Sequence, residues 1–179
     1  MPIIGYRGKK PKIDTDAFIM NSATLLGDVV LGSNVLVLSN AVLRGDFNQI
    51  YIGDNVCIQE NSVLNPVYEE PIRVEGYSII GYGAKLHGGE IKKGVFIGMN
   101  SVILRGAKIG EDSIVAAGSI LMENMEVPPR SLVIGTPAKV VRKLNNEDID
   151  WIEGAVSAYM EVLEDYKREL REWEIRHSV

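Results

Sequence analysis

The chain has 179 residues, of which 46% are hydrophobic and 24% charged, and it carries a formal net charge of −5 and one cysteine, Cys57. This composition is typical of a soluble globular domain, and it excludes a disordered, collagen-like or disulfide-linked chain. No apolar run approaches the roughly 18 residues that a membrane span needs, and no apolar stretch follows the first basic residues, so we predict a cytoplasmic protein with no membrane contact.

The basic residues near the beginning form one short cluster, made of Arg7, Lys9, Lys10 and Lys12. Nucleic-acid-binding proteins usually present a basic face with interleaved aromatic residues, which this cluster does not supply. We therefore predict no nucleic-acid partner.

A repeat of six residues organises the sequence from residue 13 to residue 133. Aliphatic residues occupy the same place in 19 hexads, and a small or β-branched residue follows most of them four positions later, with Phe47 as an exception. The aliphatic anchors are Ile13, Ile19, Leu25, Leu31, Val37, Leu43, Ile52, Ile58, Leu64, Ile80, Leu86, Ile91, Ile97, Ile103, Ile109, Val115, Leu121, Val127 and Val133. Neither a helical period of 3.6 nor simple strand alternation explains this spacing.

The period instead predicts a coil of three short strands with a turn after each. Three hexads would close one triangular coil, and 19 anchors would give about six coils stacked along one axis. Gly or Asn flanks many anchors, including Asn34, Asn55 and Gly81, and we expect turns with positive φ at these residues. The prediction is an all-β parallel β-helix over residues 1–144.

Three irregularities interrupt the repeat. The step from Leu43 to Ile52 is nine residues, so residues 44–49 form a bulge. A loop with a proline near each end, residues 65–71, follows Leu64, and one residue is missing between Leu86 and Ile91. Loops on a rigid scaffold often carry function, and Glu69 and Glu70 could transfer protons there.

The pattern changes to a helical period in the last part of the chain. Apolar residues recur at steps of three or four at Ile149, Ile152, Val156, Tyr159, Leu163, Tyr166, Leu170 and Trp173. Asn145 or Asn146 is a suitable N-cap before two acidic residues. We predict a helix of about 27 residues within residues 145–176, which packs on the β-helix or on a neighbouring subunit.

The middle of the chain resembles the γ-class carbonic anhydrase family. The segments that carry the resemblance are VLRGDFNQIYIGDNVCIQENSVLNP and IIGYGAKLHGGEIKKGVFIGMNSVIL, and it extends over about residues 13 to 165. It implies a left-handed β-helix and a homotrimer. It also implies a zinc or iron site at the subunit interface, built from three histidines, two from one subunit and one from the next.

Two of these three histidines are replaced. The family patterns VLH, IGH and LHG align with VLNP, IGYG and KLHGG, which places Asn65, Tyr82 and His87 at the ligand positions with the family's spacing intact. A neutral amide oxygen is a weak zinc ligand, and a phenol would have to ionise first. We expect zinc or iron to bind weakly at most, and Tyr82 to form a hydrogen bond across the interface with His87 or Asn65.

Other positions of the family are retained. Arg44 and Asp46 match a pair that bridges subunits in the family, and their alternative role is an ordinary ion pair. Gln59 matches a glutamine near the metal-bound water, and Tyr159 matches a helix tyrosine that approaches the site, although it also lies on the apolar stripe. We expect Cys57, where the family often has Asn, to be a buried filler and not a nucleophile.

Three functions remain open. The first is a γ-carbonic anhydrase-like homotrimer with little CO2 hydratase activity, which acts as a scaffold or binds a small molecule or a bicarbonate-like anion. The second is a hexapeptide acyltransferase that uses an acyl-CoA donor, with His87 as the general base. The third is an active carbonic anhydrase with an unusual metal shell.

Overall fold

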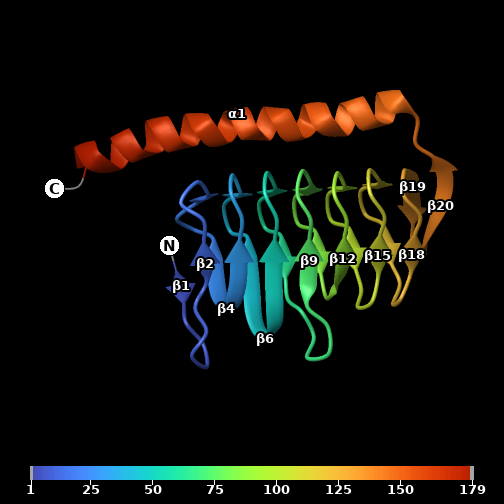
Figure 1. Cartoon of the computed structure of the whole chain (residues 1–179), viewed down its shortest axis with the longest axis horizontal. Coiled ribbons are helices and arrows are strands. Elements are labelled where there is room, and N and C mark those ends of the chain that lie inside the picture. Colours follow the sequence, from blue (N-terminus) through green and yellow to red (C-terminus); the bar gives the residue numbers. More distant parts are fainter. Residues whose placement is uncertain (1, 178–179) are drawn as a thin grey trace.

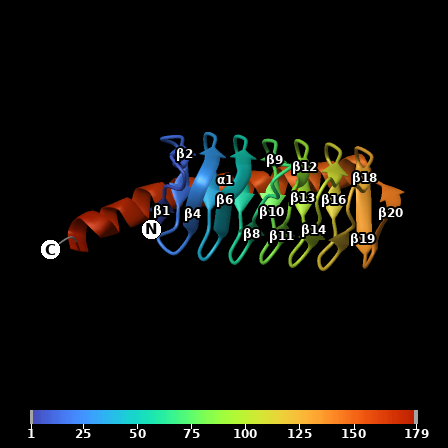
Figure 2. The same cartoon turned by 90° about the horizontal axis from the view of Figure 1, so that it is seen from below.

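The computed structural model describes the backbone of residues 2–177 and the side chains of residues 2–170. The chain forms a left-handed parallel β-helix followed by one long helix, as Figure 1 shows. Three faces of short strands surround the core, and each is named here after a strand of one central coil, β10, β11 or β12 (Figure 2).

The number of coils follows from the strands of the β10 face. It consists of seven parallel strands, β3 (Phe18–Ile19), β5 (Leu36–Val37), β7 (Cys57–Ile58), β10 (Ile79–Ile80), β13 (Phe96–Ile97), β16 (Ile114–Val115) and β19 (Ser131–Gly135). A final strand, β20 (Ala138–Lys143), pairs with β19 antiparallel and closes that end of the stack. The chain therefore makes about seven coils, and the expected number of six was too low.

The other two faces share the two longest strands. The β11 face contains β1 (Ile3–Ile4), the first parts of β4 (Thr24–Leu31) and β6 (Val42–Ile52), β8 (Val63–Leu64), β11 (Lys85–Leu86), β14 (Val102–Ile103) and β17 (Ile120–Leu121). The β12 face contains β2 (Lys12–Ile13), the later parts of β4 and β6, β9 (Ile72–Val74), β12 (Gly89–Ile91), β15 (Lys108–Ile109) and β18 (Glu126–Val127).

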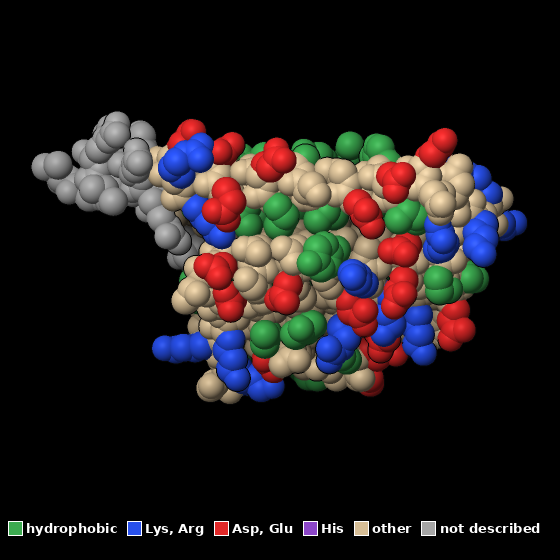
Figure 3. All heavy atoms as spheres, turned by 45° about the horizontal axis from the view of Figure 1, so that its top comes forward, with side chains coloured by type: hydrophobic (Ala, Val, Ile, Leu, Met, Phe, Trp, Pro, Cys, Tyr) green, Lys and Arg blue, Asp and Glu red, His purple; other side chains and the backbone are tan. Residues whose placement is uncertain are grey.

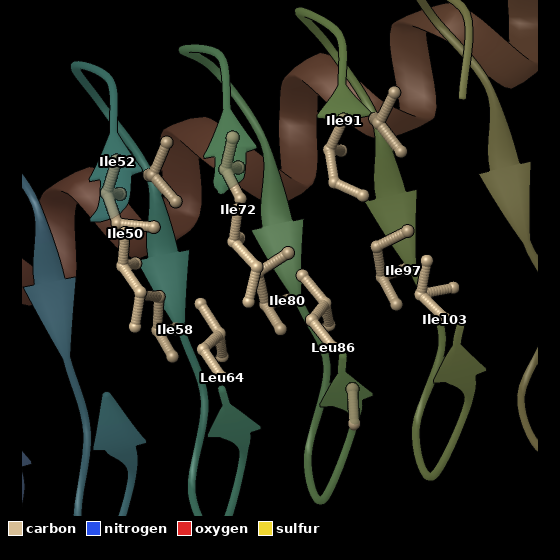
Figure 4. Close-up of a cluster of buried hydrophobic side chains, with 14 of the residues drawn as sticks. Ile50, Ile52, Ile58, Leu64, Ile72, Ile80, Leu86, Ile91, Ile97 and Ile103 are labelled. Carbon is tan, nitrogen blue, oxygen red and sulfur yellow. The ribbon is translucent and has the colours of Figure 1, made fainter. Parts of the chain in front are cut away.

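The anchors of the hexads form the core, as the period predicts. Side chains of one face stack on equivalent side chains of the next coil, for example Ile58 on Ile80 and Leu64 on Leu86 (Figure 4). Val74, which the hexad count omits because it follows the long loop, is a further fully buried anchor. Phe47 is 42% exposed, because the bulge moves it out of the coil and Ile50 takes the inward place.

Asparagine and glycine serve different purposes at the corners. Asn34 and Asn55 have φ values of 54° and 56°, as expected for corner turns. Gly81 does not have a positive φ, contrary to the expectation. A Cβ atom there would lie 2.4 Å from the carbonyl oxygen of Ile97, so the close stacking of two coils is what requires glycine at this position.

The helix α1 (Asn146–His177) is 32 residues long, not about 27, and runs back along the β10 face from the last coil past the first (Figure 1). Leu36, Cys57 and Ile79 pack against Ile152 and Val156. Figure 3 shows hydrophobic side chains along this junction and acidic side chains on the outer side of α1. The side chain of Trp173, the last residue of the predicted apolar stripe, lies outside the described part of the structure.

A reciprocal cap begins α1. The Asp148 N–H donates to Asn145 Oδ1 at 2.9 Å, and the Asn145 N–H donates to the Asp148 carboxylate at 2.8 Å, so Asn145 is the N-cap. Arg142 donates to both Asp148 oxygens, at 2.6 and 2.8 Å. These bonds lower the pKa of Asp148 to about 2.

Among the described residues, no helix is long and apolar enough to cross a membrane.

Candidate functional site

The residues aligned with the family's metal ligands lie at the two ends of β11. Asn65 follows β8 and His87 follows β11, and because these strands pair in register the two residues lie in adjacent coils at the same corner. The Asn65 N–H donates to the Leu86 carbonyl at 2.9 Å, which fixes this stacking. Tyr82 precedes β11 and therefore lies at the opposite corner of the β11 face.

The Asn65 side chain makes three hydrogen bonds within the chain. Its Oδ1 accepts a hydrogen bond from Arg44 Nη2 at 2.7 Å. Its Nδ2 donates to the Arg44 carbonyl at 3.0 Å and to Asp46 Oδ1 at 3.3 Å. Arg44 Nε also lies 3.4 Å from Asp46 Oδ1, so Asn65 joins the predicted pair into one network of three side chains.

His87 is held by one ring nitrogen. Its Nδ1 lies 3.0 Å from the backbone carbonyl oxygen of Asn65, and the side chain is exposed. Since a carbonyl oxygen can only accept, Nδ1 carries the proton and donates. In this tautomer Nε2 is the acceptor nitrogen, and no hydrogen bond to it is described within residues 2–170.

A second cluster surrounds Tyr82. The buried Gln59 accepts a hydrogen bond from the Tyr82 N–H at 3.0 Å and donates from Nε2 to the Tyr159 hydroxyl at 2.5 Å. The hydroxyls of Tyr82 and Tyr159 are 3.0 Å apart. The structure thus brings together three of the residues singled out from the sequence, and it joins α1 to the corner before β11.

Burial makes the acidic groups beside this cluster hard to ionise. Desolvation, together with the hydrogen bond to Tyr82, raises the pKa of Tyr159. Desolvation also raises the pKa of the Cys57 thiol, with a smaller contribution from Glu60. Cys57 is 1% exposed beneath α1, as expected for a filler. These groups are neutral at physiological pH, so they act through hydrogen bonds and packing.

The site does not fit the family's metal. Asn65 and Tyr82 stand at two of the three ligand positions, and neither an amide nor a protonated phenol is a good zinc donor. The amide oxygen of Asn65 already binds a guanidinium cation, which would also repel a divalent ion nearby. Of the three positions only His87 offers a good donor, and one imidazole is a poor zinc site.

Two excursions from the coil pack together beside Asn65, a feature the sequence analysis missed. The ring of Phe47, in the bulge, stacks on Tyr68, in the loop, with centroids 4.5 Å apart. Asn48 Nδ2 donates to the Tyr68 carbonyl at 2.9 Å. The signal available in the sequence was an aromatic residue in each of two insertions one coil apart.

The two loop carboxylates lie near this corner. Glu70 Oε2 is buried without a hydrogen-bond partner, and it lies 3.7 Å from where a Cβ atom on Gly88 would be. Glu69 and Glu70 contribute to the raised pKa of Arg105, mainly set by Glu123. No described contact ties either carboxylate to the hydroxyl cluster, so a proton-transfer role for them stays a prediction.

Comparison with known protein families and proteins points to one group. A model described as "Bacterial transferase hexapeptide (six repeats)" matches residues 88–122. A carbonic anhydrase from Geobacillus kaustophilus is 39% identical over 92% of this chain and 91% of its own length. Gamma carbonic anhydrase 2 of Arabidopsis thaliana mitochondria is 30% identical over 90% of this chain, which spans 60% of that protein.

The same fold is found in solved structures. A crystal structure of a Bacillus cereus protein, provisionally described as an acetyltransferase, superposes with a TM-score of 0.91 at 39% identity. The match covers 92% of this chain and 96% of that one. Relatives of this fold thus carry the names of two enzyme classes.

Proposed function

Because the chain belongs to the γ-class carbonic anhydrase-like family of hexapeptide-repeat proteins, we propose that it forms a homotrimer with an altered site at the subunit interface. The trimer binds zinc or iron weakly or not at all and has little CO2 hydratase activity. The observation that carries this proposal is the Asn65 side chain, whose potential ligand atom is held by Arg44.

The outward side chains of the coil support an interface on the β11 face. The β10 face is covered by α1, and the β12 face presents Arg73 over the Tyr51 ring and a Lys108–Glu126 ion pair to solvent. The β11 face instead presents a row of partly exposed apolar residues that no other described residue is seen to cover: Val42, Val63, Val102 and Ile120. The exposed Lys85 lies in the same row between Val63 and Val102, and its Nζ donates to the Gly83 carbonyl at 2.9 Å. An uncovered apolar row on a flat face suits self-association with cyclic closure.

Chemistry supports low hydratase activity. A catalytic zinc requires three good donors and an open fourth place, where bound water becomes a nucleophile near neutral pH. Asn65 and Tyr82 supply neither imidazole nor carboxylate.

The guanidinium of Arg44 suits a small anion, and a bicarbonate-like anion or another small carboxylate is the ligand class we assign to this corner.

Restoration of the histidines tests the proposal. The double variant Asn65→His and Tyr82→His should bind about one zinc ion per interface, whereas the parent should bind little, because three imidazoles at the family's spacing make a complete ligand set. Each single variant should bind less than the double variant. The measurements are elemental analysis after dialysis without chelator, stopped-flow CO2 hydration, and mass by light scattering, for which we expect three times 19.7 kDa.

A matched control adds the same residues elsewhere. The variant Lys10→His and Glu126→His places one new imidazole just before β2 and the other on β18, at opposite ends of the solenoid. It should bind no more zinc than the parent. A folded trimeric double variant that takes up no more zinc than this control would show that the three positions do not converge. Tight zinc and full activity in the parent would refute the proposal itself.

An acyltransferase is the second candidate, because the Bacillus cereus structure carries that description. We expect no dependence on acetyl-CoA, because His87 stands at a ligand position of the carbonic anhydrase family, which accounts for this residue without an acyl-transfer role. Thermal shift with acetyl-CoA and an assay for acyl transfer to sugar and amine acceptors test this. Saturable stabilisation of several degrees with measurable transfer would favour the second candidate.

A further inference from the structure

The Gln59 amide sets the direction of every hydrogen bond in the Tyr82 cluster. Its carbonyl oxygen is fixed by the backbone N–H of Tyr82, which can only donate, at 3.0 Å. The other end of the amide is therefore the NH2 group, and it donates to the Tyr159 hydroxyl oxygen. This assignment follows from hydrogen-bond chemistry, without any choice of amide orientation.

For the proton of Tyr159, one hydrogen-bond acceptor is described. Its hydroxyl oxygen already accepts from Gln59, and within the described residues the other group in hydrogen-bond contact with it is the Tyr82 hydroxyl, at 3.0 Å. Either hydroxyl can be the donor of this bond, and we assign Tyr159 as the donor, because the Tyr82 oxygen is the one acceptor described for its proton, whereas the Tyr82 side chain is 39% exposed. With this assignment the Tyr82 proton has no acceptor among the described residues of its own subunit.

At the other end of β11 the group without a described partner is an acceptor, not a donor. There the Nδ1 proton of His87 is committed to the Asn65 carbonyl, and Nε2 is an unused acceptor on an exposed ring. One strand thus separates an unused donor from an unused acceptor. No described hydrogen bond joins Tyr82 to His87 within one subunit.

Cyclic assembly brings these two ends together. If copies pack their β11 faces around an axis parallel to the solenoid, the corner where the face begins in one copy meets the corner where it ends in the next. Resting on the proposed trimer, we propose that Tyr82 donates a hydrogen bond to Nε2 of His87 of the partner subunit. The occupant of this surface is a second copy of the chain.

The same accounting selects His87 over Asn65 as the acceptor. The Asn65 oxygen accepts from Arg44 and its NH2 group already has two acceptors, so it has little capacity left for a second subunit. The completed relay runs from Gln59 through Tyr159 and Tyr82 to His87 and ends on the Asn65 carbonyl. A directional hydrogen bond would therefore join subunits at the place where the family has a metal ion, and chelators should leave the assembly intact.

Nitrogen-15 NMR of the histidine rings tests this directly, since the chain has two histidines. In the parent trimer at about pH 8, where an ordinary imidazole is neutral, His87 should be protonated at Nδ1, and its Nε2 resonance should be displaced in the direction of hydrogen-bond acceptance. The Tyr82→Phe variant should return Nε2 to the position of a free imidazole nitrogen. His177→Gln assigns the two rings, and Tyr166→Phe, which changes a tyrosine of α1 outside the Tyr82 cluster, should leave the resonance unchanged.

Subunit dissociation on dilution gives a second readout. Tyr82→Phe and His87→Gln should each weaken the trimer by about 2- to 13-fold per contact, as expected for one net hydrogen bond of about 0.5–1.5 kcal/mol. The double variant should dissociate no more readily than either single variant, because both changes remove the same hydrogen bond. EDTA should not alter the parent's dissociation.

The outcomes separate this inference from the proposed function. A trimer in which His87 carries its proton on Nε2, or in which Tyr82→Phe leaves Nε2 unmoved, overturns the intersubunit bond and leaves the trimer in place. A monomeric parent at micromolar concentration overturns both. Additive losses in the double variant also contradict a shared bond.

Discussion

Tyr159→Phe tests whether the buried hydrogen bond of Gln59 matters for stability. The substitution keeps the ring in its place between α1 and the β10 face and removes one oxygen, the acceptor for Gln59 Nε2. Gln59 is 3% exposed, so water cannot easily replace the lost partner. An unsatisfied buried amide costs about 1–3 kcal/mol of the free energy of unfolding.

The loss should be visible as a lower melting temperature. In a domain of this size, about 1 kcal/mol shifts Tm by about 2–4 °C, so Tyr159→Phe should melt about 2–12 °C below the parent. The matched control is Tyr166→Phe, on the same helix, because Tyr166 packs its ring against Phe18 with centroids 5.9 Å apart and no described hydrogen bond uses its hydroxyl. We expect the control to melt within about 1 °C of the parent.

Circular dichroism at a fixed protomer concentration is the assay, because assembly makes Tm depend on concentration. A cycle with Gln59→Met should give a double variant that is about 1 kcal/mol more stable than the sum of the single effects, since either change breaks the same bond. Equal melting of Tyr159→Phe and Tyr166→Phe would refute this reasoning.

Three further predictions concern the coil, the helix cap and the thiol. Gly81→Ala should destabilise the protein by about 1–3 kcal/mol in urea unfolding, because its Cβ would lie 2.4 Å from a carbonyl oxygen of the next coil. Gly154→Ala should instead stabilise it by about 0.5–1 kcal/mol, because nothing lies within 4 Å of the added Cβ and alanine favours the helix. Hydrogen bonds from Arg142 hold the pKa of Asp148 at about 2, so the stability from this cap is present above about pH 4 and lost as the pH falls towards 2; Asp148→Asn should flatten Tm against pH in that window and not above it. Burial raises the pKa of Cys57, so the thiol should react with iodoacetamide at a rate set by unfolding, and rapid labelling of the native protein would contradict its placement.

The sequence predicted the coil well because one physical constraint repeats there. Each aliphatic anchor must stack on the anchor one coil away, so a period of six and a coil of about 18 residues are visible without tertiary information, as Ile97 and Val115 illustrate. The same pattern located the bulge and the loop. It missed the anchor Val74, which lies six residues before Ile80, because the long loop before it breaks the phase with Leu64.

The hydrogen bonds of the candidate site could not be predicted in this way. The sequence placed Asn65, Tyr82 and His87 by spacing, but spacing says nothing of how a side chain is used. That Asn65 is held by Arg44, or that Gln59 reaches a helix residue 100 positions away in the chain, depends on contacts between distant segments. The helix was predicted too short because its apolar stripe weakens before its last turns.

The long helix also fixes the number of coils. Along α1, Trp151 packs on Phe96 and Tyr166 packs on Phe18, so 15 helix residues, about 22 Å at 1.5 Å per residue, cross the four strand spacings from β13 to β3, about 19 Å at 4.8 Å each. The two periods correspond at about three to four helix residues per coil. An inserted coil of 18 residues would therefore shift every later helix contact out of place unless about three or four residues were added to α1 as well. Solenoids without such a helix can grow by duplication alone, whereas in this chain a change of length must occur in two distant segments together.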